Sequence, residues 1–286
     1  MRKTIKTLVL FLLVALMLLS GLAQRGRGLV QLPQSTVAIV RSSKANATDL
    51  QYSDIKAMVT EAVRLAGGLS GIVRNGDVVV IKPNLVVSRS SPEVNGVTTD
   101  YRVVRAVVEL VREINPNGKI YVMEGSSQNT RTVMQALYYD AAHIPGVDQF
   151  IAIEEDSGAW QDFNSPGLVR VSLPNGLLHT EYYLNRKYKE ANVVISVANL
   201  KTHQQATVTG AIKNVGIGAT PANIYGNSST DVGRHSMVNH NSTDLQKWIH
   251  DFYLCRPVDF AIIDGLQGVE NGPSSDSGMN RRRILA

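Results

Sequence analysis

Two patterns of apolar and polar positions repeat along the chain, and each predicts one kind of element. Residues 53–66 and 99–114 carry apolar side chains three and four positions apart, the spacing of a helix with one buried face. Residues 77–82, 193–197 and 258–264 are mostly apolar segments that contain valine and isoleucine, the pattern of a strand buried on both faces. Because such segments alternate, with glycine-rich turns between them, the sequence predicts an α/β fold. We expect a mostly parallel doubly wound sheet with helices on both faces.

Weaker signals fill the rest of the pattern. If the sheet is read correctly, Val79, Val194 and Ile262 are buried in its interior strands. Residues 216–243 are rich in Gly, Asn, Ser and Thr without periodicity, and so long a segment is usually functional or disordered. Further strands are expected at 36–41, 119–123 and around 149–153, 168–173 and 177–182, and further helices at 130–143 and near 206–214.

The N-terminus has the pattern of a secretory signal peptide. Three basic residues precede an apolar run from Leu8 to Leu19, and Gly21-Leu22-Ala23 offers small residues for cleavage. The run is shorter than the roughly 20 residues of a membrane span, so the chain would touch a membrane only through an uncleaved signal segment. We therefore expect a signal peptide at 1–23, a flexible lead-in at 24–35 and a secreted or periplasmic α/β domain at 36–286. The abrupt ending indicates that this domain is incomplete at its C-terminus.

Charge and cysteine content exclude two classes of function. The net charge is +5, but residues 1–23 carry three basic and no acidic residues, so the mature chain carries +2. So small an excess gives no basis for nucleic-acid binding. The single cysteine, Cys255, excludes an iron–sulfur cluster or a structural zinc site ligated by cysteines within this chain. A lone thiol of this kind is ordinarily buried and inert.

Polar residues follow the predicted interior strands. Lys82 and Asn84 follow the strand at 77–82, and Lys201 and His203 follow the strand at 193–197. Parallel strands bring their carboxyl ends to one edge of a sheet, where ligands of open α/β folds bind. We expect these groups to converge with Asp264, the end of the strand at 258–264, on one crevice for a small anionic ligand. The alternative is that each lysine is a separate solvated surface group.

The chemistry of this set suggests roles for its members. His203 is a candidate general acid or base, because an imidazole titrates near neutral pH. Asp264 would orient His203, so we expect the two within reach of each other, directly or through one water or ion. They are also candidate ligands for a possible divalent metal, although their spacing matches no metal motif. The remaining candidate ligand-binding residues are Thr209, Lys213, Asn214 and the loop residue His235.

The chain resembles the family of unknown function DUF362. The motifs that carry the resemblance are Val-Ile-Lys82-Pro-Asn84-Leu, Gly96-Val-Thr-Thr99, Ala-Asn-Leu-Lys201-Thr-His203, Val-Thr209-Gly-Ala-Ile-Lys213-Asn214, a following His235, and Ile-Ile-Asp264-Gly with Gly272-Pro273. They occur in the family's order over roughly residues 36–286. The resemblance implies no settled reaction. The resemblance includes members that look fused to ferredoxin-type modules with cysteine-ligated clusters, but the single cysteine of this chain does not support such a redox role. Members of the family typically continue beyond the point where this chain ends, which agrees with a truncated C-terminus.

Three functions remain open from the sequence. The first is an exported enzyme that acts on a small anionic ligand through a crevice of Lys, His and Asp side chains. The second is a non-catalytic periplasmic or extracellular binding protein that uses the same basic crevice. The third is an inactive remnant that lacks the last part of its fold.

Overall fold

The computed structural model describes residues 35–226, 243–270, 272, 279–280 and 284–285. The predicted signal peptide, nearly all of the lead-in and His235 lie outside these residues. Within them, no helix is long and apolar enough to cross a membrane.

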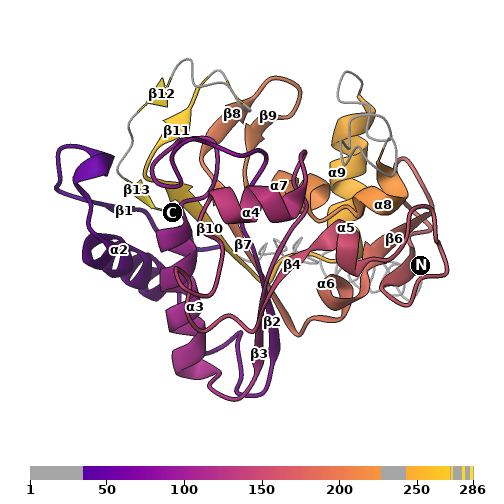
Figure 1. Ribbon diagram of the computed structural model, residues 1–286, viewed down its shortest axis with the longest axis horizontal. Coiled ribbons are helices and arrows are strands. Elements are labelled where there is room, and N and C mark those ends of the chain that lie inside the picture. The colour runs from indigo at the N-terminus through magenta and orange to yellow at the C-terminus, as the bar shows by residue number, and fades with distance from the viewer. Residues whose placement is uncertain (1–34, 227–242, 271, 273–278, 281–283, 286) are drawn as a thin grey trace, which may run out of the picture. The chain divides into compact units, whose positions relative to one another are not determined.

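A seven-stranded sheet forms the centre of the described chain (Figure 1). Its strand order is β1-β13-β10-β7-β2-β3-β4. The five strands β10, β7, β2, β3 and β4 are parallel to one another, whereas β13 runs antiparallel to both β1 and β10. Its strands are β1 (Val40–Arg41), β2 (Val78–Lys82), β3 (Lys119–Glu124), β4 (Gln149–Ala152), β7 (Val193–Asn199), β10 (Phe260–Gly265) and β13 (Ile284–Leu285).

Three antiparallel pairs lie outside this sheet. The pair of β8 and β9 directly follows β7, and the pair formed by β11 directly follows β10, so both extend from the carboxyl edge of the parallel strands (Figure 1). The pairs are β5 (Leu168–Ser172) with β6 (Glu181–Asn185), β8 (Lys201–His203) with β9 (Thr207–Thr209), and β11 (Gly268–Val269) with β12 (Met279–Asn280).

Helices cover both faces of the sheet. One hydrophobic core joins it to α2, α3 and α4, and a second joins it to α6, α7, α8 and α9. The helices are η1 (Ala47–Asp49), α2 (Tyr52–Leu65), α3 (Tyr101–Ile114), α4 (Thr130–Ala136), α5 (Ile153–Asp156), α6 (Arg186–Glu190), α7 (Ala211–Gly218), α8 (Ala222–Tyr225) and α9 (Asp244–Cys255).

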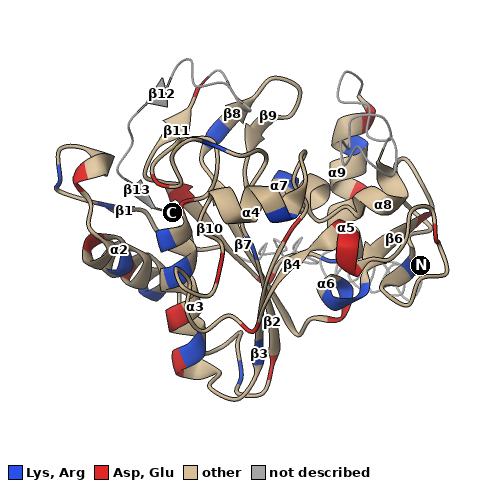
Figure 2. Ribbon diagram, viewed as in Figure 1, with Lys and Arg blue, Asp and Glu red and all other residues tan. Residues whose placement is uncertain are grey.

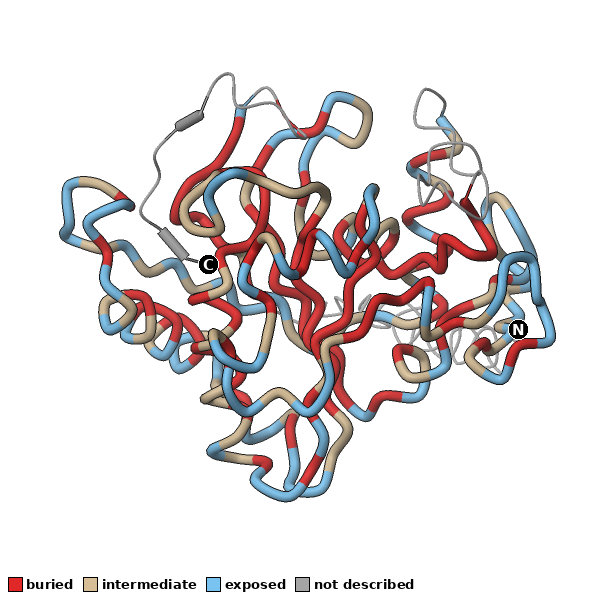
Figure 3. The backbone as a smooth tube through the Cα atoms, in the orientation of Figure 1, coloured by how far each residue is buried: buried red, intermediate tan, exposed pale blue. Residues whose placement is uncertain are grey.

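The strand pattern explains why both faces are covered. Val79 packs into the first core and Val80 into the second, because successive side chains of a strand point to opposite faces. Val79, Val194 and Ile262 are at most 3% exposed, as expected for interior strands. Figure 3 shows the buried residues running through the centre of the sheet. The predicted doubly wound α/β fold is confirmed.

Two predicted helices differ from the observed ones. The helix expected at 130–143 ends at Ala136, because Tyr138 adopts a φ of 63° that an α-helix cannot contain. The segment near 206–214 begins as a strand, not a helix. Its residues 207–209 are two threonines and a valine, which favour a strand, and they pair with Lys201–His203. Gly210 then caps α7, which starts only at Ala211.

Candidate functional site

The order of the strands places a topological switch point beside β2. After β2 the chain continues to β3 and β4 on one side, and then crosses back to place β7 and β10 on the other. The carboxyl ends of β2 and β7 therefore mark the point where the winding direction reverses, which is where open α/β sheets bind ligands. Lys82 and Asn84 lie at the end of β2, and Asn199 and Lys201 at the end of β7. The basic positions of β8 and α7 lie above this edge (Figure 2).

Lys82 is buried at this point instead of reaching solvent. Its side chain is fully buried, and its Nζ donates to Glu124 Oε1 at 2.7 Å and to the Pro83 carbonyl at 2.7 Å. Glu124 ends the neighbouring strand β3 and also accepts from the backbone amides of Leu85 and Gly125. The Lys82–Glu124 ion pair therefore joins the ends of two strands. A lysine at a buried strand end needs such a partner, because an unpaired charge would be expensive to bury.

Asn214 attaches α7 to the same place. Its Nδ2 donates to the Lys82 carbonyl and to Ser196 Oγ, each at 3.0 Å. Its Oδ1 accepts from Lys82 Nζ at 3.2 Å and from Asn84 Nδ2 at 3.3 Å. Gly218 lets α7 come this close, since a Cβ there would lie 2.5 Å from Lys82 Nζ. Asn84 and Asn214 thus lie together as expected, and the helix is held directly over the switch point.

Lys201 is the first residue of β8 in the β8–β9 pair. It is 3% exposed, and its Nζ donates to the Val97 carbonyl at 2.5 Å. Burial lowers the pKa of its amine well below the ordinary value, and the nearby charges of Lys213 and Arg89 lower it further, against the opposing effect of Glu124. Thr209, its partner across the hairpin, is buried, and its Oγ1 has no hydrogen-bond partner among the described residues.

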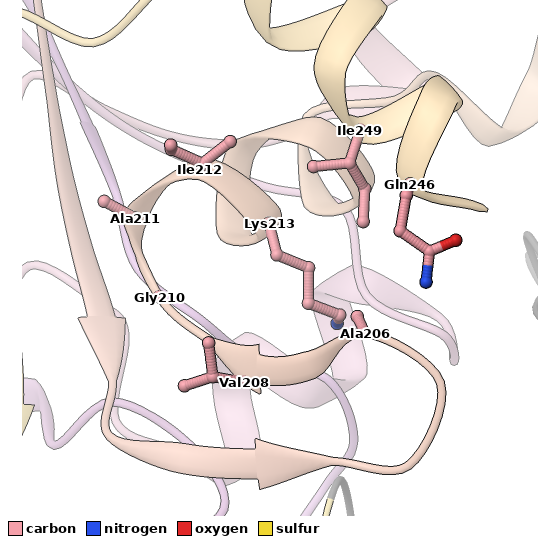
Figure 4. A pocket seen from close by; sticks show the side chains of 8 residues that line it. All are labelled: Ala206, Val208, Gly210, Ala211, Ile212, Lys213, Gln246 and Ile249. Atoms are coloured by element: carbon pink, nitrogen blue, oxygen red, sulfur yellow. The ribbon is translucent and has the colours of Figure 1, made fainter. Parts of the chain in front are cut away.

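Lys213 reaches the same group of charges from α7. Burial of its amine, with repulsion from Lys82, lowers its pKa to about 8, although Glu124 acts in the opposite direction. Within the described residues it makes no hydrogen bond and no ion pair. Its side chain lines a pocket of about 330 Å³ between β9, α7 and α9 (Figure 4). Lys213 therefore interacts electrostatically with both Lys82 and Lys201, so the three lysines are not separate surface groups.

His203 and Asp264 are held separately. His203 is buried, and its Nδ1 accepts from the backbone amides of Gln205 and Ala206, so the neutral ring carries its proton on Nε2. Asp264 accepts from the backbone amides of Asp100 at 2.8 Å and Leu266 at 3.0 Å. In the described part of the chain, no hydrogen bond joins the two side chains. Contact through a water or an ion stays a prediction.

The environment of Asp264 changes its acidity. Burial raises the pKa of its carboxyl to about 7, and the nearby Asp100 raises it further, while the two amide hydrogen bonds oppose the change. Asp264 can thus hold or release a proton near neutral pH.

Among the described residues, no three His, Cys, Asp or Glu side chains are grouped as metal ligands would be.

Sequence reasoning missed two charged members of this group. Glu124, at the end of β3, was not among the candidate residues, and Arg89 showed no signal because it lies in the irregular segment after β2. The pairing of Glu124 with Lys82 could have been inferred, since two neighbouring parallel strands end in opposite charges. Arg89 was not predictable from periodicity or spacing.

The lactate racemase apoprotein from Thermoanaerobacterium thermosaccharolyticum is a similar solved structure, with a TM-score of 0.47 and 13% sequence identity. The match covers 80% of this chain and 51% of that one, so the chain spans about half of that protein's length. No curated protein matches the chain. The sequence profile of a domain of unknown function, DUF362, matches residues 79–286. With most of its length matched in this way, the chain belongs to the DUF362 family.

Proposed function

We propose that this protein is an enzyme that acts on a small anionic ligand bound at the carboxyl ends of β2 and β7. The observation that carries the proposal is the imbalance of charge there. Lys213 acts on Lys201, Lys82 acts on Lys213, and among the described residues Glu124 is the carboxylate that opposes them at these two depressed lysines. Glu124 is already paired with Lys82.

An anion would relieve this imbalance. The lowered pKa values of Lys201 and Lys213 mean that their charged forms are unfavourable in the unliganded site. A carboxylate or phosphate near both amines would favour the charged forms, so its binding would be accompanied by proton uptake. Asn84 Oδ1 and Thr209 Oγ1, both without partners in the described chain, supply further polar groups beside the crevice.

The catalytic roles follow from the groups that can exchange protons near neutral pH. His203 would act as a general acid or base through Nε2, because Nδ1 is occupied by backbone amides. Asp264 would stabilise the bound state from the end of β10, where its carboxyl titrates near pH 7. A possible divalent metal would be held by Asp264 and His203, the oxygen and nitrogen donors at this edge.

The second candidate is a non-catalytic binding protein that uses the same crevice. The separate hydrogen bonding of His203 and Asp264 favours it, because an enzyme of this kind would be expected to pair its base with an orienting carboxylate. The lysines bind the anion in both cases. Turnover of a bound ligand distinguishes the two.

Calorimetric titration with sulfate and acetate, at constant ionic strength, tests the shared part of the proposal. Both anions keep their charge between pH 6 and 9, so a change in affinity reports the protein. Affinity should fall as the pH rises through about 8, since Lys213 then loses its proton. Replacing Lys213 with Met should weaken binding and remove this pH dependence. Lys247→Met is the control, because Lys247 lies on α9 in an exposed ion pair with Asp244. Absence of binding at every pH would contradict the proposal.

A further inference from the structure

Lys213 differs from the other lysines of the site in having no fixed partner. Lys82 is paired with Glu124, and Lys201 donates to the Val97 carbonyl. Lys213 makes no such contact within the described residues. An amine without a structural task, placed beside a cavity, is available to react.

The pocket next to Lys213 is apolar and open to solvent. Val208 and Ile212 form part of its lining and are 47% and 51% exposed. Ile249 of α9 lies opposite and is buried. Figure 4 shows the Lys213 side chain extending from α7 toward Ala206, between the hairpin and α9. A volume of about 330 Å³ is at the lower end of the range for small-molecule sites.

The surroundings of the amine thus offer two kinds of contact. On one side, Lys82 and Lys201 lie close enough to interact electrostatically with Lys213, and a carboxylate bound there would favour the charged forms of these amines. On the other lie aliphatic side chains, which accept a hydrocarbon tail. The amine lies between them. A ligand that uses the charged groups, the amine and the aliphatic side chains has a carboxylate, a carbonyl carbon beside it and an aliphatic substituent.

We propose that Lys213 forms an imine with an aliphatic 2-oxo acid, whose carboxylate is attracted by the neighbouring lysines and whose side chain enters the apolar pocket. This inference rests on the proposed anion site and names its substrate class. The Nζ lone pair attacks the carbonyl carbon and gives a carbinolamine. Loss of one water, made from the carbonyl oxygen and two protons, leaves the C=N bond. No oxidant or reductant is needed, and hydrolysis reverses the step.

The pKa of the amine agrees with this chemistry. An amine with a pKa of about 8 is unprotonated in about a tenth of molecules at pH 7, whereas an ordinary lysine is almost fully charged. Burial and the charge of Lys82 cause the difference, so it belongs to this position in the fold. Lys201 cannot replace Lys213 as the nucleophile, because it is buried and its Nζ donates to the Val97 carbonyl.

The test is reductive trapping on the full chain. The protein is incubated with 4-methyl-2-oxopentanoate or with pyruvate in the presence of cyanoborohydride, and the modified lysine is found by peptide mass spectrometry. The expected product is a stable secondary amine at Lys213, formed at a rate that rises with a midpoint near pH 8. The longer acid should react roughly tenfold faster than pyruvate, since its extra carbons enter the pocket.

Two variants and a competitor complete the design. Lys213→Arg keeps a positive charge but removes the nucleophile, and should give no adduct at this position. Lys247→Arg should trap as well as the wild type, because this exposed lysine lies near the pocket without lining it. Sulfate should slow trapping in the unaltered protein, which keeps the test valid if Lys213→Arg fails to fold.

The outcomes separate this inference from the proposed function. Sulfate binding without any adduct at Lys213 would overturn the imine and leave the anion site in place. Adducts spread equally over Lys213 and the exposed lysines would also overturn it. Absence of both binding and trapping would contradict both proposals, and equal rates for the two acids would refute the part played by the apolar pocket.

Discussion

Replacing Glu124 with Gln should destabilise the fold more than any exposed change of the same kind. The variant keeps the shape of the side chain but removes the charge that balances Lys82, whose side chain is fully buried. Breaking a buried pair by removing one partner costs about 3–5 kcal/mol. The amide of Gln would also present a donor toward an existing donor, either Lys82 Nζ or the backbone amide of Leu85.

An upper limit on this cost comes from the lysine itself. Lys82 can escape by losing its proton, which costs about 5 kcal/mol at pH 7 for an ordinary lysine pKa of about 10.4. The loss of stability should therefore be about 3–5 kcal/mol at pH 7. It should shrink as the pH rises toward 10, because the unfolded chain then releases the proton as well.

Urea unfolding followed by circular dichroism measures the effect. The control is Glu61→Gln, which breaks the exposed Arg64–Glu61 pair and should leave the midpoint almost unchanged. The double change Lys82→Met with Glu124→Gln should recover much of the lost stability, since no charge then stays unpaired. A loss at pH 7 below about 1 kcal/mol, or one that does not change with pH, would refute the role assigned to this pair.

Three further predictions concern the core, the acidity of the site and export. Val79→Ala should cost on the order of 1–4 kcal/mol of unfolding free energy, while Val37→Ala, at a residue that is 76% exposed, should cost almost nothing; equal effects in urea unfolding would contradict the assigned core. Asp264 has a pKa of about 7 in the fold against 3.8 ordinarily, so its protonated form stabilises the fold at low pH. That stability, about 4 kcal/mol, is lost as the pH rises from about 4 through 7. Urea unfolding of Asp264→Asn across this range should lack that part of the pH dependence. N-terminal sequencing of exported material should begin near Gln24, whereas intact Met1 in membranes would indicate an anchor.

The sequence predicted the sheet well because its strands are buried on both faces. Segments as rich in β-branched residues as 193–197 are difficult to place anywhere else, and β7 extends only two residues beyond that segment. The convergence of Lys82, Lys201 and Lys213 also followed from parallel strands having their carboxyl ends on one edge. Periodicity could not predict the hairpin at 201–209, because each of its strands has only three residues.

The partners of the site residues were less predictable. Side-chain pairing depends on which strands are neighbours, and the position of β7 beside β2 is not encoded in any local pattern. For the same reason the amide contacts of Asp264 could not be foreseen, since they come from Asp100 at the start of α3, 164 positions away, and from Leu266. His235 lies outside the described residues, and its assignment stays a prediction.

The position of β7 beside β2 also determines when the crevice can form. Val78 at the start of β2 bonds to Asn192 beside β7 across a separation of 114 residues, and β3 and β4 are synthesised in between. Closing so long a loop costs entropy before any contact compensates for it, so this pairing is expected late in folding. Until then the apolar edge of β2 has no neighbour on that side and is open to self-association. A nascent chain of this protein would need protection over that interval, and a substitution that slows the docking of β7 would reduce yield without altering the finished site.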